Sequence, residues 1–196
     1  MLCKESLLRE VSWRKKIIMK LFIASDIHGS KYYAQKLVER FKEEKADKLI
    51  LLGDIYYHGP RNPLPKEYAP MEVANLLNEL TDKLVVIQGN CDSEVDQMIS
   101  KFHFVKESLI LLDGKKIMLT HGHILNKDNL EKGAYDVLAY GHFHINFMEE
   151  KDGVLVINPG SVSLPKENSA SGYITIENNV VKQHDIDGNV LYQKQI

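Results

Sequence analysis

Acidic, amide and imidazole side chains recur in this chain of 196 residues directly after short apolar runs. The members of this set share a capacity to bind metal ions: Asp26, His28, Asp54, Asn90, His121, His142 and His144. Oxygen donors mixed with imidazoles suit manganese, iron, zinc or nickel better than calcium or magnesium, which prefer shells made of oxygen alone. Because these donors exceed what one tetrahedral ion needs, the set predicts two ions that share a carboxylate.

Each of these residues also has an explanation without a metal. Asp26 and Asp54 could cap the helices that follow them, Asn90 could hold a turn, and a lone histidine at a strand end could be a hydrogen-bonded surface residue. However, the Asp-x-His and His-x-His spacings would direct both side chains of a pair to the same side of extended backbone. Ligands of layered α/β folds bind at the carboxyl ends of strands, so the recurrence favours one shared site.

The elements that position these side chains are visible as short apolar runs bounded by turn residues. Such runs predict strands covered on both faces, here over residues 20–25, 48–52, 83–88, 116–120, 136–140 and 154–157. The amphipathic stretches 32–44 and 71–80 predict helices. Asp113-Gly114 and Asn178-Asn179 predict two hairpins. The order of these elements predicts an α/β (α+β) sandwich in which two mixed sheets are flanked by helices.

The composition narrows the class of protein. Lys and Arg (25) nearly balance Asp and Glu (27), so no basic field would attract nucleic acid. The two cysteines exclude a disulfide framework and suit a reducing, cytoplasmic compartment. No apolar run approaches the roughly 20 residues that span a bilayer, so no membrane partner is expected. Residues 1–18 are expected to be an extension, with Leu7, Leu8 and Val11 on one side of a short helix, before a domain over 19–196.

Five motifs resemble, in order and spacing, those of the calcineurin-like metallophosphoesterase superfamily: Asp26-x-His28, Gly53-Asp54, Gly89-Asn90-x-Asp92, His121-Gly-His123 and Gly141-His142-x-His144. The similarity extends from Met19 to about Ile186. The stretches HGPRNPLP, GNCD, LTHGH and NPGSVSLPK resemble the small bacterial phosphodiesterases of the YfcE type. The resemblance implies the superfamily's four-layer sandwich and a metal-dependent enzyme that hydrolyses phosphoesters, in the first place phosphodiesters.

The resemblance also implies a role for each metal-binding residue. The ligands divide into a set for the first ion, a bridging residue and a set for the second ion: Asp26, His28 and His144; Asp54; and Asn90, His121 and His142. Three of them, Asp54, Asn90 and His121, are implied to be catalytic. Two divalent ions, first of all Mn²⁺ with Ni²⁺, Fe²⁺, Co²⁺ or Zn²⁺ as alternatives, would share a bridging hydroxide that attacks phosphorus in line.

Two positions depart from the wider superfamily. Many members carry histidine after the ligand asparagine, whereas this chain has Cys91, a weaker hydrogen-bond donor. Cys91 is therefore expected to be neither nucleophile nor metal ligand, and a general acid is missing. The protein-phosphatase branch has arginine four residues after the bridging aspartate, where this chain has His58. The nearby Arg61 could clamp a phosphate with paired donors, or HGPRNPLP could be only a surface loop.

The residues expected to bind substrate lie next to the ligands: His58, Arg61, Cys91, Asp92 and His123. Asp92 and His123 could instead orient the metal ligands from behind. Outside the site, three residues are expected in the core and two on the surface: Met98, Phe102 and Phe104, and His103 and His184.

Two other functions are compatible with the same motifs. One is a phosphomonoesterase that acts on a small metabolite, and the other is a catalytically silent scaffold with the same fold. Scaffolds of this kind typically lose a metal ligand, whereas the full set is present here, which favours an enzyme acting on a small phosphoester. Small proteins of this fold often assemble, so a homo-oligomer, either a dimer or a tetramer, is expected.

Overall fold

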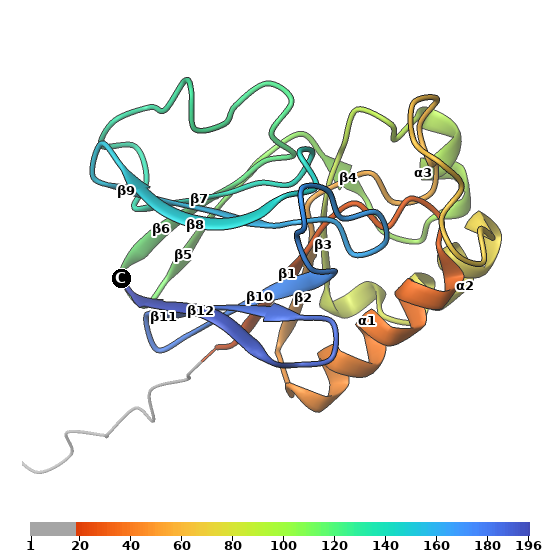
Figure 1. Cartoon of the computed structure of the whole chain (residues 1–196), viewed down its shortest axis with the longest axis horizontal. Helices are drawn as coiled ribbons and strands as arrows, with labels where there is room; N and C mark the ends of the chain where they lie inside the picture. Colours follow the sequence, from red (N-terminus) through yellow and green to blue (C-terminus); the bar gives the residue numbers. More distant parts are fainter. Residues whose placement is uncertain (1–18) are drawn as a thin grey trace, which may run out of the picture.

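Two mixed β-sheets lie face to face in the computed structural model, which describes residues 19–196 (Figure 1). The fold class predicted from the sequence, two mixed sheets flanked by helices, is confirmed. The predicted extension over residues 1–18 lies outside the described residues. Within the described part of the chain, no helix combines the length and the apolar character needed to cross a membrane.

The larger sheet has seven strands in the order β12-β11-β10-β1-β2-β3-β4. Its parallel strands are β1 (Leu21–Ala24), β2 (Lys48–Leu51), β3 (Leu84–Ile87) and β4 (Phe104–Val105). Its antiparallel strands are β10 (Gly172–Glu177), β11 (Val180–Asp185) and β12 (Val190–Gln195).

The smaller sheet has five strands in the order β5-β6-β7-β9-β8. Its parallel centre consists of β6 (Lys115–Leu119), β7 (Val137–Ala139) and β9 (Val154–Pro159), and its edges are the antiparallel β5 (Ser108–Leu112) and β8 (Asn146–Lys151). All the strands predicted from apolar runs are present, and both predicted hairpins join the expected strands. β4, β8 and β12 were not predicted.

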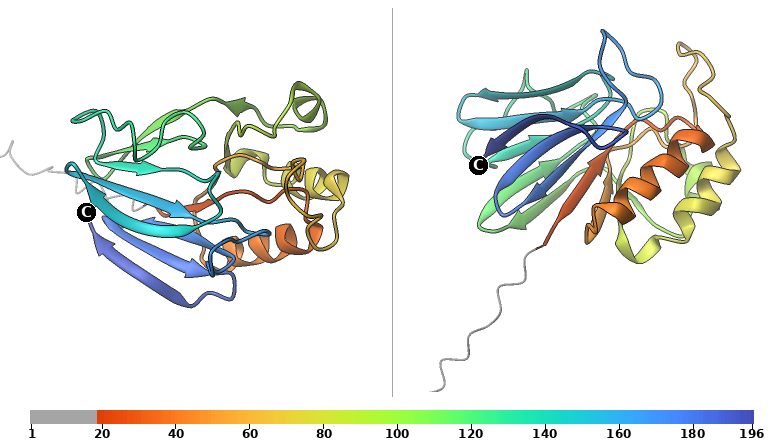
Figure 2. Two further views of the ribbon diagram at one scale, coloured as in Figure 1. Left: turned by 45° about the horizontal axis from the view of Figure 1, so that its top comes forward. Right: turned by 60° about the horizontal axis from the view of Figure 1, so that its bottom comes forward.

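Alternation along the strands places the larger sheet between two layers of apolar side chains. In β1, Phe22 packs toward the helices, whereas Leu21 and Ile23 pack toward the smaller sheet. The helices are α1 (Lys31–Glu43), α2 (Pro70–Asn78) and α3 (Glu94–Ile99), with a short 3₁₀ helix at Thr81–Lys83. Figure 2 shows α1 and α2 beside the larger sheet. Helices α1 and α2 were predicted from the sequence, and α3 was not.

Among residues 19–196, no helix covers the outer face of the smaller sheet. The segment 120–136 is irregular, and its side chains Leu125 and Tyr135 pack on Leu138, Tyr140 and Val156 of the sheet. One outer layer of the sandwich is therefore a loop that begins at the threonine of the LTHGH stretch, one residue before its first histidine. This layer is continuous with the strand ends that carry the chemistry.

Two predictions of burial were wrong. Met98 is 84% exposed, because the short α3 turns the neighbouring Ile99 toward the core instead. His184 is only 4% exposed. A register shift between Gln183 and His184 in β11 buries both side chains, and the His184 ring stacks on Tyr173 at a centroid distance of 4.7 Å. Phe102 is buried, Phe104 packs on the core, and His103 is exposed, as predicted.

Candidate metal centre

The predicted ligands lie in the loops that follow the parallel strands of both sheets. Asp26 and His28 follow β1, Asp54 follows β2, and Asn90 follows β3. The others come from the smaller sheet, where His121 follows β6 and His142 and His144 follow β7. The carboxyl ends of these strands thus bring together side chains from two sheets, as the positional pattern predicted.

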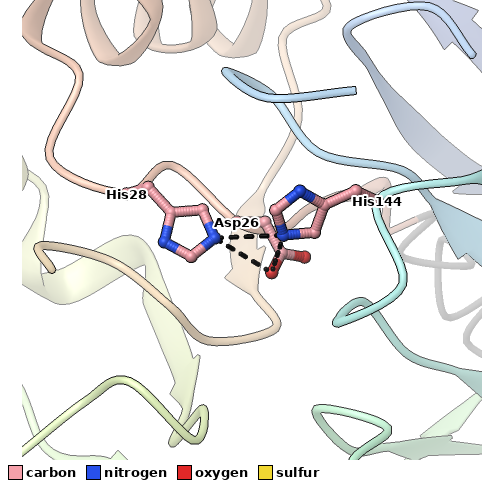
Figure 3. A group of neighbouring side chains, drawn as sticks. All are labelled: Asp26, His28 and His144. Carbon is pink, nitrogen blue, oxygen red and sulfur yellow. Dashed lines mark hydrogen bonds and ion pairs between the residues drawn. The ribbon is translucent and has the colours of Figure 1, made fainter. Parts of the chain in front are cut away.

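Asp26, His28 and His144 form one compact, buried group (Figure 3). The Asp26 Oδ1 atom lies 3.2 Å from His144 Nε2 and 3.6 Å from His28 Nε2. The two Nε2 atoms are 3.1 Å apart. These three atoms lie as close together as the ligand atoms of one metal ion. Their residues are those that the resemblance assigns to the first ion.

Hydrogen bonds behind the imidazoles fix which ring nitrogen faces the centre. His28 Nδ1 lies 2.7 Å from the Tyr57 carbonyl oxygen, and His144 Nδ1 lies 2.7 Å from that of Leu164. A carbonyl only accepts, so each Nδ1 carries a proton and donates it. In the neutral rings both Nε2 lone pairs then face each other, an arrangement that a cation between them stabilises.

The Asp26 carboxylate supports the same interpretation. Its Oδ1 atom is buried and has no hydrogen-bond partner among the described residues. Burial would raise the pKa of Asp26, but His144 and His28 hold that pKa well below its usual range, so the carboxylate is charged. Without an ion, the His144 and His28 imidazoles offset this buried charge, whereas a divalent cation among the three atoms would offset it instead and leave both rings neutral. The residues present therefore fit a divalent ion.

A second group surrounds His121. Its Nε2 atom lies 3.0 Å from Asn90 Oδ1 and 3.4 Å from Asp54 Oδ1, and its Nδ1 lies 2.6 Å from the Leu52 carbonyl oxygen. Burial opposes the charged imidazole, but Asp54 and Asp26 raise the pKa of His121 to about 9. The negative surroundings that hold this proton are also the surroundings that would attract a metal ion.

Asp54 lies between the two groups. One carboxylate oxygen is 3.4 Å from His121 Nε2, and the other is 3.8 Å from His28 Nε2. This placement is that of a carboxylate able to serve two ions. His142 is less tightly placed: its ring centroid is 5.1 Å from that of His121, and its backbone N–H donates to Asp26 Oδ2 at 3.0 Å.

The backbone at the ligands is not extended, which corrects the expectation for the Asp-x-His and His-x-His pairs. The residues with left-handed φ angles of 51° to 64° are Asp26, His28, Asp54, His142 and His144. This conformation is uncommon outside glycine and is typical of functional sites, where the surrounding structure must hold it. Here backbone hydrogen bonds hold it, from Asp26 N to Gly53 O at 3.0 Å and from His28 N to Asp54 O at 2.9 Å.

The helix-capping alternative for the two aspartates was wrong. The N-cap of α1 is Ser30, whose hydroxyl accepts from the Tyr33 N–H at 3.3 Å, and the residue before α2 is Ala69. The carboxylates of Asp26 and Asp54 therefore remain directed at the centre.

Two glycines allow the loops to meet. A Cβ atom at Gly89 would overlap the Asp54 carboxylate, and one at Gly141 would lie 2.5 Å from Asp26 Oδ2 and overlap the Ser25 hydroxyl. The glycine before Asn90 and the glycine before His142 are thus needed because another ligand loop passes directly against them.

Asp92 ties two ligand loops together. Its carboxylate accepts from the backbone N–H groups of Gly89, Asp54 and Ile55 at 2.7, 2.8 and 2.8 Å. Burial raises the pKa of Asp92 to about 6. These bonds hold the loops of Asp54 and Asn90 in register, so the side chain supports the site from behind, and Asp92 also borders the cavity over the centre.

The thiol of Cys91 lies close to the centre. Its Sγ is within 4.8 Å of ligand atoms of His28 and Asp54, and its backbone N–H donates to Asp54 Oδ1 at 2.9 Å. Burial and the Asp54 charge raise the pKa of Cys91 to about 12, so the sulfur keeps its proton at neutral pH. A protonated thiol is a weak nucleophile, although the sulfur lies close enough to His28 and Asp54 to join a metal-binding group, so the role expected for Cys91 stays a prediction.

A cavity of about 680 Å³, here called the catalytic cavity, opens over the centre. Besides ligand residues, its lining includes Tyr57, Arg61, Asn62, Phe143 and Lys166. The sequence reasoning proposed Arg61 but gave Lys166 no role, although NPGSVSLPK was among the family-like stretches. The Lys166 backbone N–H donates to the His144 carbonyl at 2.9 Å, so a ligand loop positions this lysine.

Two expected substrate contacts lie outside the lining of this cavity. The His58 ring lies between Tyr57 and Tyr68, with centroid distances of 4.8 and 5.4 Å. The His123 ring is exposed, lies 5.4 Å from that of His121, and borders a separate cavity of about 430 Å³.

Comparisons with known proteins agree with the geometry. A profile of the calcineurin-like phosphoesterase superfamily domain matches residues 19–179. The chain is 43% identical to the phosphodiesterase YfcE of Escherichia coli over 166 residues, 84% of this chain and 90% of that protein. It is 33% identical to YsnB of Bacillus subtilis, a probable metallophosphoesterase, over 90% of this chain and 97% of that protein.

Solved structures give the same result. The structure of the E. coli phosphoesterase YfcE superposes with a TM-score of 0.87 and 41% identity, covering 91% of this chain and all (100%) of that one. Vps29 from Cryptosporidium parvum shares the fold at a TM-score of 0.63 and 18% identity, covering 91% of this chain and 99% of that one. With its motifs, its fold and its buried Asp/His groups, the chain belongs to the calcineurin-like phosphoesterase superfamily.

Proposed function

We propose that this protein is a metal-dependent phosphodiesterase with a two-ion centre. The observation that carries the proposal is the convergence of the two imidazole Nε2 atoms of His28 and His144 on the buried Asp26 Oδ1. The similarity to a protein named a phosphodiesterase, at 43% identity, supports the choice of reaction. Because the donors mix oxygen with imidazole nitrogen, we propose Mn²⁺ as the preferred ion, with Ni²⁺, Fe²⁺, Co²⁺ and Zn²⁺ as alternatives.

Bound divalent ions would supply an activated water molecule and would stabilise the attacking and leaving oxygens during in-line displacement at phosphorus. The chain's residues do the rest. Asp26, His28 and His144 form one binding set, Asp54 serves both sets, and Asn90 adds a neutral oxygen that limits the negative charge. Arg61 and Lys166, which line the catalytic cavity, would bring positive charge to the phosphate.

The choice of diesters over monoesters depends on Cys91. Its thiol keeps its proton at neutral pH and is a poor donor, so it does not replace an imidazolium as general acid. The aryl leaving group of an activated diester departs without protonation. The leaving group of an alkyl monoester needs protonation by a general acid, and the monoester carries more negative charge. The site is therefore better matched to diesters.

The test is hydrolysis of bis(p-nitrophenyl) phosphate by protein stripped of metal with a chelator and then loaded with one divalent ion at a time. We expect no turnover in the stripped protein and recovery with Mn²⁺, together with a slower reaction on p-nitrophenyl phosphate. Metal binding without hydrolysis of any diester would favour the scaffold alternative. Faster hydrolysis of monoesters would favour a phosphomonoesterase.

Four finer predictions accompany the proposal. We propose that residues 19–196 form the catalytic domain, that the protein acts in the cytoplasm on small phosphoesters, that it does not bind nucleic acid, and that it forms a dimer or tetramer. The near balance of 25 basic and 27 acidic residues supports the third of these. Light scattering of the purified protein would measure the fourth.

A further inference from the structure

A second depression continues from the catalytic cavity. It has a volume of about 320 Å³, and its lining includes Tyr56, Tyr57, Tyr68, Pro70 and Val95. We call it the tyrosine groove. Cys91, Ser93 and Tyr57 line both the catalytic cavity and this groove. The two spaces therefore meet at Cys91, Ser93 and Tyr57 beside the metal centre, and a molecule with its phosphate at the centre has room to extend into the groove.

The aromatic wall of the groove is held in place by ring contacts. The rings of Tyr57, His58 and Tyr68 form a row, with centroid distances of 4.8 and 5.4 Å and interplanar angles of 34° and 32°. The Tyr68 ring also lies so close to Gly29 that a Cβ there would be 2.6 Å from a ring carbon. Tyr57 is 43% exposed. A fixed row with an accessible face can stack on a planar group with little loss of side-chain entropy.

The charges of the two spaces differ. The catalytic cavity has Arg61 and Lys166 in its lining, which suits the anionic phosphate. Among the described residues, neither lysine nor arginine lines the tyrosine groove, and its carboxylate, Asp96, accepts from Ser93 N at 2.7 Å and Ser93 Oγ at 3.1 Å. An uncharged group with an aromatic face matches this lining, and a second anionic group does not.

We propose that the tyrosine groove binds an uncharged, planar aromatic ester group of the substrate while the phosphate occupies the catalytic cavity. This inference rests on the proposed phosphodiesterase function, since it assigns the position of one of the two ester groups. It makes Tyr57 and Tyr68 specificity-determining residues. The row explains His58 as a spacer between the two tyrosines rather than as a phosphate contact.

Binding of phenyl phosphate and methyl phosphate to the Mn²⁺-loaded protein, measured by calorimetry before the slow monoester hydrolysis proceeds, tests the groove independently of diester turnover. A stacked aromatic pair changes affinity by roughly 2- to 10-fold beyond the effect of area burial, so phenyl phosphate should bind about tenfold more tightly or better. Tyr68→Leu should reduce this ratio at least about threefold, whereas Tyr68→Phe, which keeps the ring, should preserve it.

Two further variants keep the test sharp. Val95→Asn changes an exposed groove residue on α3 without threat to the fold and should also lower the phenyl-to-methyl ratio. Tyr192→Leu, at an exposed tyrosine of β12, is the matched control and should leave the ratio unchanged. Equal binding of the two phosphates by the unmodified protein, or an unchanged ratio in Tyr68→Leu and Val95→Asn, would overturn the inference.

Kinetics separates this inference from the proposed function. We expect phenyl p-nitrophenyl phosphate to have a higher kcat/KM than methyl p-nitrophenyl phosphate, with the ratio lowered by Tyr68→Leu. Hydrolysis of both diesters at equal kcat/KM would overturn the groove and leave the phosphodiesterase intact. Preferential binding of phenyl phosphate without hydrolysis of either diester would support the groove and overturn the phosphodiesterase.

Discussion

The metal centre and the rim of the catalytic cavity are constrained to different degrees. At the centre, Asp26 and His28 are fully buried, and carbonyl oxygens fix the imidazole rings. The rim, defined here as Tyr57, Arg61, Phe143 and Lys166, is exposed; Phe143 is 41% exposed. A centre fixed this closely determines the reaction, whereas an exposed rim can change its side chains and so determines which substrate is accepted.

The largest effect is expected from Asp54→Asn, which removes the carboxylate placed between the two ligand groups. The amide keeps the volume but loses the charge that both proposed ions would need, so kcat/KM for diesters should fall at least about 10³-fold. Metal content by mass spectrometry should fall as well, while circular dichroism stays unchanged. Asp152→Asn, in the exposed turn between β8 and β9, is the control for loss of one negative charge.

A smaller effect is expected from Asp92→Asn, which tests support of the centre from behind. The amide NH₂ cannot accept the hydrogen bonds that the backbone N–H groups of Asp54 and Gly89 donate to Asp92 Oδ2, so the loops of Asp54 and Asn90 should shift. Loss of such a supporting residue weakens metal affinity by about 10- to 100-fold. Titration with Mn²⁺ would measure it, and unchanged affinity would show that the loops hold their geometry without Asp92.

Arg61→Lys sharpens the comparison from the side of the rim. If Arg61 binds phosphate, the ammonium cannot reproduce the paired donors of the guanidinium, so kcat/KM should fall about tenfold through KM with metal affinity unchanged. Arg40→Lys on α1, where the arginine bonds to Glu43, is the matched control. If Arg61→Lys and Arg40→Lys have equal kinetics, HGPRNPLP is only a surface loop and Arg61 does not bind phosphate.

The smallest effect is expected from Cys91→Ser. A thiol whose pKa is raised to about 12 is protonated from pH 6 to 9, so it neither attacks phosphorus nor titrates in that range. The diester pH–rate profile of the variant should superimpose on that of the unmodified protein, within about twofold in kcat. Alkylation of Cys91 in the metal-free protein should likewise stay slow up to pH 9. Loss of all activity in Cys91→Ser would mean that the sulfur is a ligand or nucleophile.

The predicted ligands could be read from the sequence because they depend on a local pattern, an apolar run followed by a polar side chain. Other features depend on contacts between distant segments. The left-handed backbone at Asp26 and Asp54 arises from hydrogen bonds between their two loops. Asp92 was named but its three backbone partners lie on loops up to 38 residues away. Lys166 joins the site because its own loop is bonded to His144.

Burial was predicted less well where the register is irregular. The shift at Gln183 and His184 buries two successive side chains, which no alternating pattern would indicate. Met98 was misplaced because the short helix α3 has no apolar periodicity long enough to define its inner face. The irregular layer over residues 120–136 has no strand or helix pattern to predict at all.

The triad of Asp26, His28 and His144 also has a mechanical consequence. Its first two members belong to a loop of the seven-stranded sheet, and the third belongs to a loop of the five-stranded sheet. An ion held by all three would cross-link the two halves of the sandwich, in the manner of a staple. The free energy of unfolding would then depend on the concentration of the ion, and it would rise by about 2.7 kcal/mol when the free ion is at 100 times its Kd. The same three side chains would thus stabilise the packing of the two sheets as well as form the reaction centre.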